Sequence, residues 1–181
     1  LSSLTGSGTI AINPINLASF FAIGTIPGIT VAKATPALVI SAGALVGCCT
    51  FFCDAARPRI DRVAGAGIVG ICALAFVLVP LNTAWLGFVP ESSYTGRMGF
   101  TLLFGITALA FEGALSAGAR SVVKGGVLAF LVVGFAIFNV WYQTLQLRPN
   151  AACDVAELAL IVGFTAQLAL AARSTAAHED A

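Results

Sequence analysis

The clearest candidate for chemistry in this sequence is Glu112, the one ionisable residue that lies well inside a long apolar run. A carboxylate in the interior of a membrane span is costly, so such a residue is a functional candidate by default. Glu112 could relay protons, bind a cation or ligate the metal of a pigment. In the alternative interpretation it points toward the membrane surface or a partner helix, because Arg120 follows within about two helical turns.

The cysteines form a second group of reactive side chains, at Cys48, Cys49, Cys53, Cys72 and Cys153. Cys49 and Cys53 share one face of a helix because they are four residues apart. The sequence has no Cys-x-x-Cys motif with a second half, so it predicts no metal site of the zinc type. Free cysteine is among the most buried residue types, and we expect buried, apolar thiols here.

The other polar residues do not form a catalytic set. His178 lies beside Glu179 and Asp180 in a polar C-terminal stretch, where we expect it to be solvated. No Ser-His-Asp combination or phosphate-binding loop is present in a suitable place, so the sequence predicts no enzyme. Asp154 and Glu157 fall in the first turns of the last predicted helix, where acidic side chains suit the helix dipole. We interpret them as ordinary capping residues.

The composition places these residues in a membrane protein. Nine Lys and Arg and eight Asp and Glu amount to 9% of the 181 residues, while 59% are hydrophobic. A soluble surface needs roughly a quarter to a third of its positions charged, so a soluble enzyme is excluded. A nucleic-acid binder would need a basic patch, whereas the formal net charge is +1. We therefore expect the lipid bilayer, and no nucleic acid, among the partners.

The charge-free runs give the positions of the helices, because a membrane span needs about 20 mostly apolar residues. They lack the alternating pattern of barrel strands. They predict an all-α integral membrane protein, a bundle of six helices at about 15–32, 35–55, 63–86, 97–118, 122–146 and 153–173. Thr25-Ile26-Pro27-Gly28 would kink or break the first helix, so that segment is either a bent span or a re-entrant one, which would leave five full spans.

This map has a single transmembrane domain, because no linker is long enough to divide the chain. Residues 1–14 form an N-terminal segment, 15–173 the transmembrane helical domain, and 174–181 a polar C-terminal tail. The even-numbered helices end in small residues followed by Arg, at 55–57, 118–120 and 171–173. This pattern indicates three repeated helical hairpins, as in many transporters. In the alternative interpretation it arises only because Ala and Arg are frequent at such helix ends.

The basic residues are divided unequally between the two sides of this map. Six fall on the side of both termini: Arg57, Arg59, Arg62, Arg120, Lys124 and Arg173. Lys33, Arg97 and Arg148 fall on the opposite side. The positive-inside rule therefore predicts that both termini face the inside. If the first segment only dips into the membrane, the N-terminus moves outside.

The N-terminal stretch Asn13-Pro14-Ile15-Asn16-Leu17 resembles the Asn-Pro-x-Pro-Leu-Gly signature of the acetate uptake transporter family. Looser matches at Gly47, Gly67, Pro80, Gly105 and 118–120 extend the resemblance over about residues 13 to 173. The resemblance implies six helices, a hexamer with a path in each subunit, and symport of acetate or succinate with protons. It places Asn13, Pro14 and Leu17 on the substrate path, and Asn139 is a further polar residue that either lines this path or bonds a neighbouring helix.

The sequence also departs from the family's pattern. Asn16 replaces the second Pro of the signature, Ala18 replaces its Gly, and most of the aromatic and amide groups expected along the path are missing. Glu112 stands where the family has an apolar residue. The chain begins at Leu1 rather than Met, which fits a processed chain or a trimmed one. The topology is therefore expected to be that of the family, with transport retained, altered or lost.

Two functional hypotheses follow. In the first, the protein is a transporter or channel for a small monocarboxylate such as acetate, proton-coupled, without a cofactor, and assembled as a homo-oligomer. In the second, it is a non-catalytic accessory subunit of an organellar membrane complex, surrounded by other membrane subunits. In a photosynthetic complex, Glu112 could then ligate a chlorophyll, and a carotenoid could lie alongside. In both hypotheses the chain is an integral, multi-pass membrane protein, of the plasma membrane or of a thylakoid or mitochondrial membrane.

Overall fold

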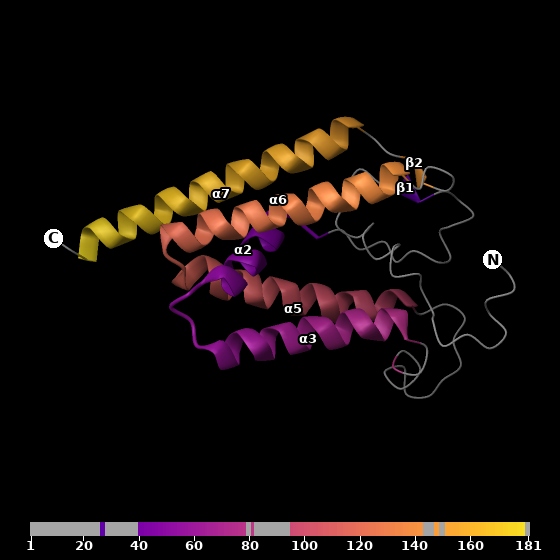
Figure 1. Ribbon diagram of the computed structural model, residues 1–181, viewed down its shortest axis with the longest axis horizontal. Helices are drawn as coiled ribbons and strands as arrows, with labels where there is room; N and C mark the ends of the chain where they lie inside the picture. Colours follow the sequence, from indigo (N-terminus) through magenta and orange to yellow (C-terminus); the bar gives the residue numbers. More distant parts are fainter. Residues whose placement is uncertain are drawn as a thin grey trace, which may run out of the picture.

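The computed structural model describes residues 26–27, 40–78, 81, 95–142, 147–148 and 151–179. This part of the chain contains five helices (Figure 1): α2 (Ala42–Cys53), α3 (Arg59–Val77), α5 (Thr95–Ser116), α6 (Ala119–Tyr142) and α7 (Ala151–Glu179). Two residues of β1 (Ile26–Pro27) pair antiparallel with β2 (Leu147–Arg148). The all-helical character predicted from the apolar runs is therefore confirmed.

Two of these helices are long and apolar enough to cross a membrane: Ala119–Phe138 within α6 and Ala151–Ala177 within α7. The predicted first helix, at 15–32, lies outside the described residues except for Ile26 and Pro27, which are extended where the helix was expected to break. Helix α7 continues through most of the predicted polar tail to Glu179, beyond the expected helix end at 173. Alanines favour helix there, and the hydroxyl groups of Ser174 and Thr175 both donate to the carbonyl of Ala171.

Helix α2 lies at the centre of the bundle and contacts α5, α6 and α7, while α3 packs on α5 and α6 packs on α7. Its 12 residues span only about 18 Å, well short of the roughly 30 Å of a bilayer core. The helix begins with a cap, in which Ser41 Oγ accepts a hydrogen bond of 3.2 Å from the Ala44 N–H. Helix α2 therefore begins at Ala42 rather than near residue 35, and it is shorter than the span expected at 35–55.

Glycines allow the backbones of these helices to touch. A Cβ on Gly113 of α5 would collide with the Gly47 carbonyl oxygen and with the backbone of Phe51 in α2. In the same way, Gly125 of α6 lies against the backbone of Thr50, and Gly126 lies against Thr165 of α7. The Thr50 and Thr165 hydroxyls donate to carbonyls of their own helices, at 2.8 and 2.7 Å, and add no polar surface to these contacts. This is the small-residue packing that membrane helices use.

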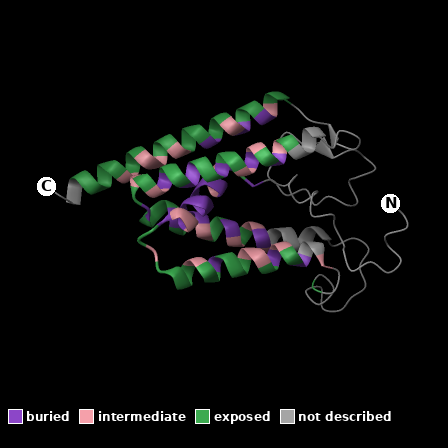
Figure 2. Cartoon of the chain, viewed as in Figure 1, coloured by how far each residue is buried: buried purple, intermediate pink, exposed green. Residues whose placement is uncertain are grey.

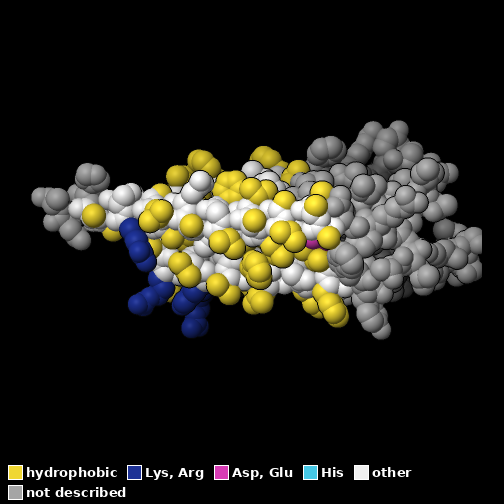
Figure 3. Space-filling view, turned by 90° about the horizontal axis from the view of Figure 1, so that it is seen from above, with side chains coloured by type: hydrophobic (Ala, Val, Ile, Leu, Met, Phe, Trp, Pro, Cys, Tyr) yellow, Lys and Arg dark blue, Asp and Glu magenta, His cyan; other side chains and the backbone are white. Residues whose placement is uncertain are grey.

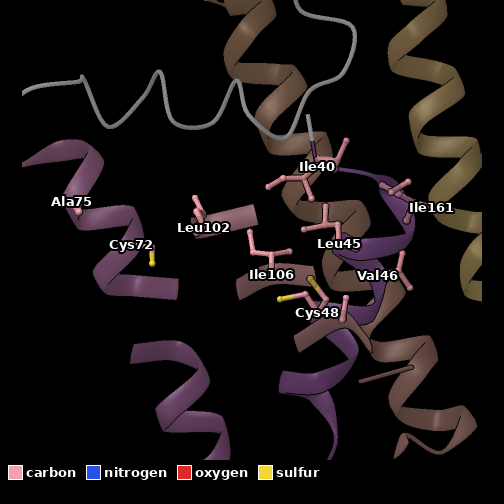
Figure 4. Packing of buried hydrophobic residues seen from close by; sticks show 14 residues of the cluster. Ile40, Leu45, Val46, Cys48, Cys72, Ala75, Leu102, Ile106 and Ile161 are labelled. Carbon is pink, nitrogen blue, oxygen red and sulfur yellow. The ribbon is translucent and has the colours of Figure 1, made fainter. Parts of the chain in front are cut away.

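Buried residues form a narrow core around α2 (Figure 2). Figure 4 shows Leu45 and Val46 of α2 between Ile106 from α5 and Ile161 from α7. The outer faces of the helices are apolar as well. Phe104 is 75% exposed, and Ile60, Leu115, Phe111 and Phe135 are also exposed. An outer surface of this kind avoids water, and it fits lipid or protein neighbours.

Candidate functional site

Of the residues proposed from the sequence, Asn13, Pro14 and Leu17 lie outside the described residues. Asn139 lies in the last turn of α6, and Glu112 lies near the C-terminal end of α5, one turn before Ser116. The structure therefore does not bring Glu112 and Asn139 together, because α5 and α6 are antiparallel and the two residues lie toward opposite ends of the bundle.

Glu112 forms an ion pair with Arg57, which follows α2 in the connection to α3. The distance between Arg57 Nη2 and Glu112 Oε2 is 3.6 Å, and the Glu112 side chain is 61% exposed. Glu112 therefore lies at an outer edge of the bundle near one end. The charged partner is Arg57 rather than Arg120, the sequence neighbour.

Arg57 is held more firmly than its acidic partner, since its side chain is only 13% exposed. Its guanidinium carbon lies 4.3 Å from the centre of the Phe51 ring, a cation–π geometry. Nη2 also donates to the Glu112 carbonyl oxygen at 3.2 Å and to Ser116 Oγ. Arg57 thus connects the α2–α3 turn to the last turn of α5.

Two further carboxylates, those of Asp154 and Glu157, lie on the inward face of α7. Asp154 is 6% exposed and Glu157 is 2% exposed. They continue toward the start of α7 the same stripe that buries Ile161 and holds Thr165 against Gly126. Spacings of three and four residues keep all four side chains on one face of the helix. Two acidic groups are therefore buried within an apolar bundle.

Helix α7 contacts the beginning of the short helix α2 about two turns after Glu157. The ring of Phe164 lies 3.5 Å from the position of a Cβ on Gly43, in the first turn of α2, and Glu157 precedes Phe164 by about two turns. Ile40, just before α2, and Leu158 belong to the same packed cluster as Ile161. The N-terminal end of α2 carries a partial positive charge, so an anion in this part of the bundle would be favoured.

The contact between Gly126 and Thr165 sets the register of α6 and α7. Asn139 is as far along α6 from Gly126 as Ala152 is along α7 from Thr165. The backbone of Asn139 is therefore about level with the first turn of α7, which carries Asp154. Of the residues proposed for a substrate path, Asn139 is the one whose backbone position falls at the same end as the buried carboxylates.

Sequence reasoning assigned Asp154 and Glu157 a capping role and missed their burial. Their spacing with Ile161 and Thr165 places all four on one face of α7, but a helix that is apolar nearly all round does not show in its sequence which face is turned inward. The cysteine prediction fares better: Cys48, Cys49 and Cys72 are buried free thiols, and Cys53 and Cys153 are half-buried. Within the described residues, no group of three or more His, Cys, Asp and Glu side chains could hold a metal ion.

Acidic side chains buried inside a helical membrane protein are rare, and such positions are candidates for a functional role. The relation to the acetate uptake transporters remains a hypothesis that depends on the residues quoted above. No protein-family model matches this chain, and no curated protein or solved structure matches it.

Proposed function

We propose that this chain is a multi-pass integral membrane protein that carries a small monocarboxylate such as acetate together with a proton. Its location in a membrane is supported by the two apolar helices of spanning length and by the exposed Phe, Leu and Ile side chains around the bundle. The visible Lys and Arg side chains gather at one end of the molecule (Figure 3). Such an arrangement leaves the length of the helices free for lipid contact.

The observation that carries the transport proposal is the burial of Glu157, at 2% exposure, beside Asp154 on the inward face of α7. Intramembrane carboxylates of transporters serve as proton relays. A short helix that begins inside a bundle offers its N-terminal end to an anionic substrate group, and α2 begins within about two turns of Glu157 along the bundle. In this proposal, Glu157 and Asp154 carry the proton and the start of α2 receives the carboxylate.

The test is uptake of radiolabelled acetate into proteoliposomes that hold the purified chain, driven by an inward proton gradient. We expect uptake above that of empty liposomes and a loss of at least tenfold for Glu157→Gln, because the amide cannot take up a proton. Asp154→Asn is expected to lower uptake, and Asn13→Ala is expected to abolish it if the signature lines the path.

Glu112→Gln is the matched control, because it removes the same charge from an exposed ion pair. Its uptake should stay within about twofold of the unmodified chain if the protonatable groups lie on α7. Loss of uptake in Glu112→Gln with full uptake in Glu157→Gln would return the proton role to Glu112. Uptake no greater than that of empty liposomes would end the transport proposal.

A second candidate is a structural subunit of a larger membrane complex. It is favoured by the apolar outer faces of α3, α5, α6 and α7, which could meet other membrane subunits or pigments. Purification from native membranes in a mild detergent separates the two proposals. Unlike chains and bound pigment would support the subunit, and a pure homo-oligomer would support the transporter.

A further inference from the structure

An open apolar groove of about 340 Å³ lies between α6 and α7 on the outside of the bundle. From α6 it is lined by residues such as Val123, Val127 and Phe130, and from α7 by residues such as Val162, Ala166 and Ala169. Its volume is in the range of small-molecule sites. Its apolar walls suit a hydrocarbon chain.

Two arginines continue the walls of this groove toward the basic end of the bundle. Arg120 precedes Val123 by three residues and Val127 by seven, so it lies on the groove face of α6. Arg173 follows Ala169 by four residues and Ala166 by seven, so it lies on the groove face of α7. Both are exposed.

These two arginines lie at nearly the same height in the bundle. The contact of Gly126 with Thr165 fixes the register of the antiparallel helices, and from it Arg120 and Arg173 fall within about one turn of each other. Lys124 lies in the next turn of α6 and adds a third cation at this end. Figure 3 shows Lys and Arg side chains, in dark blue, toward one end of the molecule.

The local helix dipole increases the positive potential at this position. Helix α6 begins at Ala119 and has no acidic residue of its own in its first turn, where Ser121 donates a hydrogen bond to the Asp54 carboxylate from the α2–α3 connection. Cations at a helix N-terminus are unfavourable to the helix itself, so Arg120 and Lys124 add to the partial positive charge that is already there. An anion placed between α6 and α7 would be attracted by all of these charges.

We propose that the α6–α7 groove binds one anionic phospholipid, with its phosphate between Arg120 and Arg173 and an acyl chain along the apolar walls. The positive charges of Arg120 and Arg173 are opposite in sign to the phosphate, and the groove continues from them along the bundle as an acyl chain continues from a headgroup. The proposal requires that α6 and α7 lie in a bilayer, and it does not depend on transport.

The test is native mass spectrometry of the full chain in detergent, titrated with phosphatidylglycerol or with phosphatidylcholine. We expect tighter binding of phosphatidylglycerol, and a loss in its affinity of about fivefold for each charge removed in the double variant Arg120→Gln/Arg173→Gln. Binding of phosphatidylcholine by this variant should persist, which also shows that the groove is intact. Ala166→Phe should weaken the binding of both lipids, because the ring fills the groove.

The matched controls lie away from the groove. Arg59→Gln/Arg62→Gln removes two charges from α3, and Ala108→Phe adds a ring to an exposed position of α5; both should bind phosphatidylglycerol within about twofold of the unmodified chain. Circular dichroism checks that each variant keeps its helices. Equal losses in the α3 and the α6–α7 charge variants, or full binding by Ala166→Phe, would overturn the proposal.

Discussion

At the scale of single residues, the position of a charged side chain within an apolar run does not show whether that side chain is buried in the folded bundle. Glu112 is far from other charges in its own run, yet α5 ends one turn later and Arg57 reaches it from a connection 55 residues earlier. Glu157 is close to the beginning of its helix, yet it faces inward and is buried. The partner of a charged side chain is set by tertiary contacts, which residue spacing within one helix does not contain.

The contacts of Arg57 predict that it matters more for stability than Glu112 does. Arg57→Ala removes two hydrogen bonds and a cation–π contact, and we expect a loss of about 2 kcal/mol in the free energy of unfolding. The measurement is thermal or denaturant unfolding in detergent, followed by circular dichroism.

Two variants separate the parts of this effect. Glu112→Gln should cost less than ~1 kcal/mol, because exposed ion pairs contribute little. Arg57→Lys keeps the charge but loses the planar fork that reaches Ser116 and the Glu112 carbonyl, so it should fall between the other two. If Glu112→Gln were as destabilising as Arg57→Ala, the ion pair would be the dominant contact.

At the scale of elements, the glycines decide how closely α2 can approach its neighbours. Gly113→Ala would place a methyl group against Gly47 and Phe51, so α2 and α5 must separate. We expect destabilisation of about 1–3 kcal/mol from such overpacking. Thermal unfolding in detergent measures the change.

Gly67 of α3 provides the matched control, because nothing lies within 4 Å of a Cβ at this position. Gly67→Ala should leave stability unchanged or raise it by up to about 1 kcal/mol, through better helix propensity alone. Equal effects of the two substitutions would mean that the close approach of α2 and α5 contributes nothing.

The ends of the helices could be predicted from the sequence where charged residues or a break follow the apolar run. The charged turn after Cys53 and the break near Ala117 mark the ends of α2 and α5, and both are close to the expected positions. The burial of Asp154 and Glu157 was not predictable in the same way, since acidic side chains at a helix start suit the dipole whether they are exposed or buried. Their orientation depends on which face of α7 meets α6.

At the scale of the whole molecule, the charges define two ends. The residues predicted to share a side, Arg57, Arg59, Arg62, Arg120, Lys124 and Arg173, lie on segments that meet at one end of the bundle. Two hydrogen bonds tie those segments together: Arg57 to Ser116, and Ser121 to Asp54 at 3.4 Å. The C-terminal end of α7 lies at this same end.

The positive-inside rule turns this arrangement into a prediction of orientation. An epitope tag placed after Ala181 should face the cytoplasmic side, or the equivalent side in an organelle. Antibody should stain the tag only after the membrane is permeabilised. Staining of intact cells or sealed, right-side-out vesicles would show the opposite orientation, and a tag placed in the α6–α7 connection is the reciprocal control.

The pairing of β1 with β2 has a consequence for the way the protein is made. Ile26 is opposite Arg148, and Pro27 is opposite Leu147, so the beginning of the chain pairs with a segment that the ribosome adds only after four of the five described helices. The early segment must stay beside the insertion machinery, or return to the bundle, until β2 emerges. A nascent chain stalled before Leu147 would contain α2, α3, α5 and α6, but it would lack the β2 strand with which Ile26–Pro27 pairs.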